Sequence, residues 1–236
     1  MRHLLSLALA AAALSPALAC AAEEGWSGSG ELGLAISKGN TDSETLVGKL
    51  AVAREDETWK HALNLAFLYG KSDDIKTARR YEVFGSSGYR LGARSYVFGS
   101  GRNERDQFST NEYQTTLAGG YGFEAIMREE TKLVFEIGPG YRWAKEQDVR
   151  VHNNEAIARG FMDFSHQLTA TTRLYDVLLV EAGADNTFVR NDFGVEVKMT
   201  DALALKAGFE VRHNTEVTED RKRTDTLTTV NVVYGF

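Results

Sequence analysis

Residues 132–143, KLVFEIGPGYRW, alternate between two kinds of side chain. One face of this stretch is apolar and aromatic: Leu133, Phe135, Ile137, Tyr141 and Trp143. The other face is charged or small: Lys132, Glu136, Gly138 and Arg142. Alternation with a period of two indicates a β-strand, because successive side chains of a strand point to opposite sides. The stretch therefore predicts a long strand with one apolar and one charged face.

The same alternation returns along most of the chain. We expect strands near residues 26–36, 45–52, 59–69, 80–91, 95–101, 113–123, 132–143, 156–164, 173–183, 189–198, 203–212 and 230–236. In 173–183 two apolar sets compete, so the pattern assigns no face there. About twelve strands, each long enough to cross a bilayer, predict an all-β fold: a single closed antiparallel up-and-down transmembrane β-barrel.

The composition agrees with a barrel and excludes several other classes. A balance of 27 Lys+Arg against 33 Asp+Glu gives a net charge of −6, which argues against a nucleic-acid-binding protein. A hydrophobic fraction of 43% excludes a disordered chain, and a mean hydropathy of −0.31 excludes a bundle of membrane-spanning helices. Only 2 prolines accompany 22 glycines, as expected where a hydrogen-bond ladder must stay unbroken. Pro139 therefore predicts a bulge or a local bend.

The N-terminus reads as an export signal. A basic start, an apolar run over residues 4–14 and small residues around Ala19 predict a secretory signal peptide over residues 1–22, cleaved near 19–22. Cys20 stands where a lipidated cysteine would stand, so the pattern leaves open whether it is lipidated or removed with the signal. Residues 23–236 would then form the barrel, in a bacterial outer membrane.

Three features favour a membrane barrel over a soluble one. Aromatic residues gather towards strand ends, where the membrane interfaces would lie. The expected connections alternate between longer and shorter, and the longer set would be extracellular. The final residues, 230–236, alternate and end in Phe236, which resembles the signal read by the outer-membrane barrel assembly machinery. We therefore expect as partners that machinery, outer-membrane lipid and lipopolysaccharide, and no nucleic acid.

The charged face of the strands would line the interior of such a barrel. The candidate lumen-lining residues are Lys49, Asn64, Arg80, Glu82, Arg90, Glu136, Arg142, Arg159, Asp163, Arg190, Glu196, Lys198, Lys206, Glu210 and Arg212. A structural or envelope-adaptation role follows, and the mixed charges are compatible with a narrow channel for small polar solutes. A soluble exported barrel that binds an apolar ligand is an alternative.

The chain offers little for catalysis. Ser165 and His166 are adjacent on one strand and should point to opposite faces, which argues against a lipase-like pair. Asp73, Asp74 and His213 could meet at one rim as in a barrel protease, but charged loops explain them more simply. The histidines show no metal-ligand spacing, and no motif for a cofactor is present. We expect no enzyme and no cofactor, with a lipase- or protease-like barrel as the alternative.

The first hairpin carries a resemblance to a known family. Residues 26–33, WSGSGELG, followed by residues 38–43, KGNTDS, resemble the start of the salt-induced outer-membrane protein family, domain-of-unknown-function group 481. Residues 113–122 and 203–209 resemble its later strands. The resemblance implies an outer-membrane barrel of unassigned biochemistry over the whole mature chain, and it brings no catalytic residues.

Overall fold

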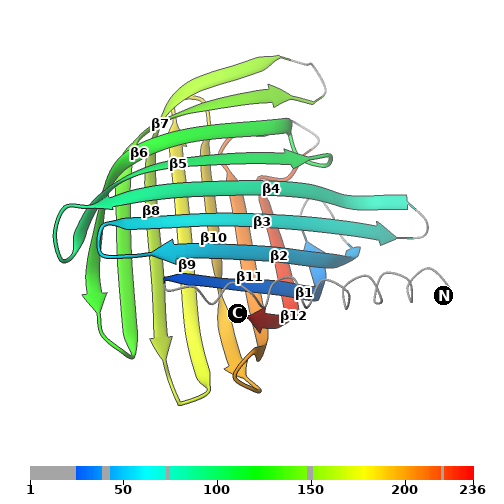
Figure 1. Ribbon diagram of the computed structural model, residues 1–236. Helices are drawn as coiled ribbons and strands as arrows, with labels where there is room; N and C mark the ends of the chain where they lie inside the picture. The colour runs from blue at the N-terminus through cyan, green and yellow to red at the C-terminus, as the bar shows by residue number, and fades with distance from the viewer. Residues whose placement is uncertain (1–24, 39–42, 73–74, 148–150, 219–220) are drawn as a thin grey trace.

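The chain forms a closed antiparallel barrel, seen in a computed structural model that describes residues 25–38, 43–72, 75–147, 151–218 and 221–236 (Figure 1). Within these residues there are twelve strands: β1 (Trp26–Lys38), β2 (Ser43–Glu55), β3 (Trp59–Ser72), β4 (Ile75–Arg90), β5 (Ser95–Asp106), β6 (Asn111–Met127), β7 (Thr131–Glu146), β8 (His152–Gln167), β9 (Thr172–Gly183), β10 (Thr187–Lys198), β11 (Leu203–Asn214) and β12 (Thr224–Gly235). Each strand pairs with its neighbours in the sequence, and β12 pairs with β1. The predicted fold class is confirmed. The expected signal peptide and Cys20 lie outside the described residues.

Pairing of the first and last strands closes the cylinder. Leu32 lies opposite Val232, and the backbone groups of Gly28 and Phe236 exchange two hydrogen bonds of 2.8 and 2.9 Å. The Phe236 ring covers Gly28, where an added Cβ would lie 2.3 Å from it. Closure leaves no strand edge, which is the condition for a sheet to exist in hydrocarbon. None of the described residues belongs to a helix that could cross a bilayer.

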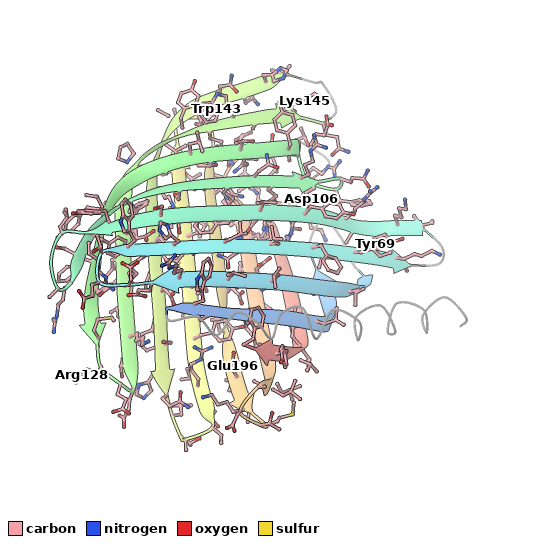
Figure 2. The ribbon with its side chains drawn as sticks, in the orientation of Figure 1. Tyr69, Asp106, Arg128, Trp143, Lys145 and Glu196 are labelled. Atoms are coloured by element: carbon pink, nitrogen blue, oxygen red, sulfur yellow. The ribbon has the colours of Figure 1, made fainter. Side chains whose placement is uncertain are left out.

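The barrel has two ends that differ in what they carry. The terminal end holds Trp26 at the start of β1, Gly235 at the end of β12, and the connections β2–β3, β4–β5, β6–β7, β8–β9 and β10–β11. The distal end holds the other connections. Figure 2 shows Asp106 and Lys145 towards the distal end and Arg128 and Glu196 towards the terminal end.

The strands run further than the sequence pattern predicted. Residues 102–112 and 144–153 were expected as connections, but β5 continues to Asp106, β7 to Glu146, and β8 starts at His152. The connections at the distal end are therefore only slightly longer on average than those at the terminal end. Most of this difference comes from residues 215–223, between β11 and β12. The sequence pattern did not show that these strands continue, because a sequence does not distinguish an inward-facing charged residue at a strand end from a charged residue in a loop.

The two faces of the sheet have opposite polarity. Many large apolar side chains point outward, among them Leu65 (38% exposed) and Phe135 (44% exposed), whereas Arg142 and Glu181 are almost fully buried inside. Aromatic residues pair on the outside near strand ends, as Trp59 does with Tyr89 at 5.1 Å between ring centroids. A soluble barrel that holds an apolar ligand would need the reverse arrangement, so this alternative is not supported.

Pro139 causes no register shift. Shifts between β6 and β7 occur instead at Asn111/Tyr113 and Glu124/Ile126. The ladder between these strands runs from Ala118 paired with Gly140 to Tyr121 paired with Ile137, and the two positions between them are unpaired. In place of the expected bulge, Pro139 therefore lies at a short gap in the ladder.

Candidate functional site: the charged lumen

The centre of the lumen is a network of ion pairs around Arg102. From β5, its guanidinium donates to Glu181 on β9 at 2.6 Å and to Glu104, two residues further along β5, at 3.0 Å. Gln114 and Thr116 of β6 also donate to Glu181, at 3.3 and 3.4 Å. Arg102 and Glu181 are 4% and 1% exposed, so this pair is shielded from water. β5 and β9 are not neighbours, so the pair crosses the inside of the barrel.

The network extends to three further strands. The cross-lumen pairs are Arg212 with Glu104, Arg190 with Glu82 at 2.7 Å, and Arg80 with Glu210 at 2.8 Å. The ring of Phe188 lies 5.0 Å from the guanidinium carbons of both Arg102 and Arg212. Charges of both signs alternate through this region, which is how a low-dielectric interior can hold them. The members come from the distal halves of their strands.

Two other ion pairs lie nearer the terminal end and are less buried. Lys49 of β2 donates to Asp192 of β10 at 3.1 Å, and their side chains are 28% and 20% exposed. The Tyr175 hydroxyl donates to the other oxygen of Asp192 at 3.2 Å. Lys206 of β11 donates to Glu31 of β1 at 3.0 Å. These two pairs and members of the Arg102 network line the same open space, and the side chains of Lys49 and Asp192 are more exposed to it than those of Arg102 and Glu181.

That open space is a cavity of about 330 Å³ inside the barrel. On the β2 and β3 side its lining includes the small side chains Ala51, Asn64 and Ala66. A second cavity, of about 410 Å³ at the terminal end, shares Asp163, Val177 and Lys206 with it. The central cavity therefore adjoins the cavity at the terminal end.

The distal end is separated from this cavity. A vestibule of about 400 Å³ there, lined among others by Arg142, Glu155 and Asn186, has no lining residue in common with the central cavity. The separating layer has two parts. One is the Arg102 network, and the other is an apolar cluster of inward-facing side chains: Val47, Leu68, Ala78 and Leu227.

The structure places the predicted lumen residues as follows. Lining the central cavity are Lys49, Asn64, Arg80, Glu82, Arg159, Asp163, Arg190, Lys206, Glu210 and Arg212. The remaining five are not in the lining of that cavity. Four of them form ion pairs: Arg90 with Glu55 and Glu124, Glu136 with Arg159, Arg142 with Glu155, and Glu196 with Arg173. Lys198 lines a pocket at the terminal end. Their role as a functional site stays a prediction.

The sequence pattern missed Arg102, Glu104 and Glu181, which are central to the network. Arg102 and Glu104 share the face of Tyr96 and Phe98, so extending the alternation of that strand would have found them. Glu181 would have settled the undecided face of 173–183, because Leu179 and Glu181 point inward together. A charge inside a closed barrel has partners, whereas the same charge in lipid would not.

The candidate catalytic residues are not brought together. His166 shares a hydrogen bond of 2.8 Å with Thr131, while Ser165 lines the terminal-end cavity. His213 shares one of 2.8 Å with Thr224 at the distal end. Asp73 and Asp74 lie outside the described residues. In the part of the chain that is described, no group of three or more His, Cys, Asp or Glu side chains could hold a metal ion.

Closed cylinder, outward apolar band and ionic interior together define a transmembrane-type β-barrel of the kind formed by porins and translocators. The NanC porin has a TM-score of 0.60 with this chain at 11% identity, covering 87% of this chain and 98% of the porin. The translocator domain of the autotransporter NalP from Neisseria meningitidis has a TM-score of 0.54 at 13% identity, covering 99% and 96%. These similarities concern the fold.

The sequence identifies the family. The model described as "Protein of unknown function, DUF481" matches residues 30–236, and the chain belongs to this family. It is also 24% identical over 221 residues to the uncharacterized protein YdiY of Escherichia coli K12, covering 91% of this chain and 85% of that protein. The family resemblance expected from the first hairpin is confirmed. The family description does not mention salt induction, so that name stays a prediction.

Proposed function

We propose that this protein is an outer-membrane barrel that serves the bacterial envelope as a narrow, largely occluded channel for small polar solutes. The observation that supports the proposal is the central cavity, which adjoins a second cavity at the terminal end and is lined by charges of both signs. A purely structural barrel has no need of a water-accessible interior. With the terminal end in the periplasm, the distal network and the apolar cluster would form the barrier to the outside.

Several expectations belong to the same proposal. Export by the N-terminal signal would deliver the chain to the periplasm, and β12 with Phe236 would be read by the barrel assembly machinery. Lipid would cover the outward apolar band, and lipopolysaccharide would surround the distal end. We further propose that the barrel is not an enzyme, since Ser165 and His166 are on separate faces and have different surroundings.

Planar-bilayer recording of the purified, folded barrel tests the channel. We expect small conductance steps, because the Arg102 network leaves little open cross-section. The double variant Arg102→Gln with Glu181→Gln removes a charge pair from the barrier and shortens the longer of its two side chains, and we expect it to conduct more readily. Absence of steps from both proteins at every salt concentration, with folding verified by resistance to denaturation in cold detergent, would overturn the proposal.

A further inference from the structure

The cavity gives the proposed channel a definite route along one wall of the barrel. On β2 and β3 several of the inward side chains at the cavity are small, as at Ala51, Asn64 and Ala66, while long charged side chains fill the opposite side. The Arg102 network is buried and hydrogen-bonded across the lumen, and its long side chains bound the cavity on the side away from β2 and β3. A solute that enters from the terminal end therefore follows the β2–β3 wall.

One ion pair spans this route. Lys49 projects from β2, on the small-residue wall, and its ammonium reaches Asp192 on β10 at 3.1 Å. Both residues line the cavity, and both side chains stay partly exposed. A solute moving along the wall must pass between these groups or beside them. Each group can meet a solute of opposite charge, since neither is sealed from water as Arg102 is.

The charges along the route are balanced in sign. Lys49 is paired with Asp192, and Lys206, at the junction with the terminal-end cavity, is paired with Glu31. A ring of one sign would favour ions of the opposite sign, as in charge-selective pores. A paired lysine and aspartate present both signs at one level, which suits uncharged solutes and solutes that carry both charges.

We infer that Lys49 and Asp192 form the selectivity-determining pair of this channel, and that the route accepts small neutral or zwitterionic polar solutes in preference to ions of a single sign. This inference rests on the proposed function. Removing one partner leaves the other charge without this counter-charge at the level of the cavity that the pair spans. The channel would then discriminate between ions by sign.

Reversal potentials measured across a KCl gradient test the pair. For the unmodified barrel we expect a value near zero. Lys49→Met should make the channel cation-selective and Asp192→Asn anion-selective, each changing the K⁺/Cl⁻ permeability ratio by roughly tenfold in opposite directions. The double variant should return to a value near zero. Lys145→Met, which removes a charge paired with Glu112 at the distal rim, should leave the ratio unchanged.

A thiol probe checks the route without altering the pair. In a Cys20→Ser background the chain has no other cysteine. Ala66→Cys should then react with sulfonatoethyl methanethiosulfonate, and the attached anion should reduce the current and shift the channel towards cations. In proteoliposome swelling, glycine should enter faster than acetate or ethylammonium through the unmodified barrel.

The outcomes separate this inference from the proposed function. Suppose that the barrel conducts, but that both single variants keep the reversal potential of the unmodified barrel and the probe at Ala66→Cys has no effect. This outcome would overturn the proposed route and the role of the pair, and it would leave the proposed channel function supported. Strong selectivity of the unmodified barrel for one sign would overturn the inference in the same way. Absence of conductance in every protein, including the neutralised Arg102 and Glu181 variant, would remove the channel itself and the inference with it.

Discussion

Arg102 shows at the scale of one residue how a barrel can bury charge. Its guanidinium donates to Glu181 and Glu104, and it lies against the ring of Phe188 at 5.0 Å. A lone charge in this position would pay a desolvation cost of several kcal/mol, and the ion pairs and aromatic contact offset it. On the surface of a soluble protein the same side chain would be hydrated and would not need these contacts.

Replacing Arg102 should therefore destabilise the barrel far more than replacing a rim cation. We expect Arg102→Ala to lower the free energy of unfolding by about 3–5 kcal/mol, because Glu181 is left as an uncompensated buried charge. Lys145→Ala should cost less than about 1 kcal/mol, since its 2.6 Å pair with Glu112 is exposed. Urea unfolding followed by tryptophan fluorescence measures both. Equal losses for the two variants would contradict this account of the network.

The sequence predicted the positions of the strands better than the positions of their ends. Alternation located the strands because outward leucines, valines and aromatics face lipid throughout, as at Leu65 and Phe135. It misplaced the distal ends because residues such as Arg102 face a charged interior, and a sequence alone cannot distinguish an interior charge from a loop charge. Across the lumen Arg102 meets Glu181 on β9 and Phe188 on β10, and no local pattern encodes contacts across a lumen.

Contact between β6 and β7 depends on glycines at the ladder gap. A Cβ on Gly138 would lie 2.1 Å from the carbonyl oxygen of Gly119, a backbone atom that cannot move aside easily. We expect Gly138→Ala to lower the free energy of unfolding by about 1–3 kcal/mol through overpacking.

Gly160 on β8 provides the matched control, since a Cβ there would meet nothing within 4 Å. Gly160→Ala should be neutral or raise stability by about 0.5–1 kcal/mol, because alanine loses less backbone freedom on folding. Parallel unfolding curves of the two variants decide the matter. The prediction would be contradicted if Gly160→Ala lowered the free energy of unfolding and Gly138→Ala did not.

At the scale of the whole molecule the barrel is asymmetric along its axis. The central cavity adjoins the cavity at the terminal end, whereas it shares no lining residue with the distal vestibule, and the ionic network and the cluster of Val47, Leu68, Ala78 and Leu227 lie on its distal side. The network is held by many charged contacts, so the apolar cluster is the weaker part of the barrier. Apolar constrictions block polar solutes by excluding water.

Shortening a side chain of the apolar cluster should therefore open the distal side. Leu68→Ala removes an inward, 8% exposed side chain at the top of the β2–β3 wall, and we expect larger and more frequent conductance steps in planar bilayers. Leu63→Ala, on the same strand, removes an outward side chain of the same chemistry and should leave conductance unchanged. The pair differs only in the face of β3 that is altered. An effect of Leu63→Ala as large as that of Leu68→Ala would show that conductance reports barrel loosening, and a silent Leu68→Ala would place the barrier in the ionic network alone.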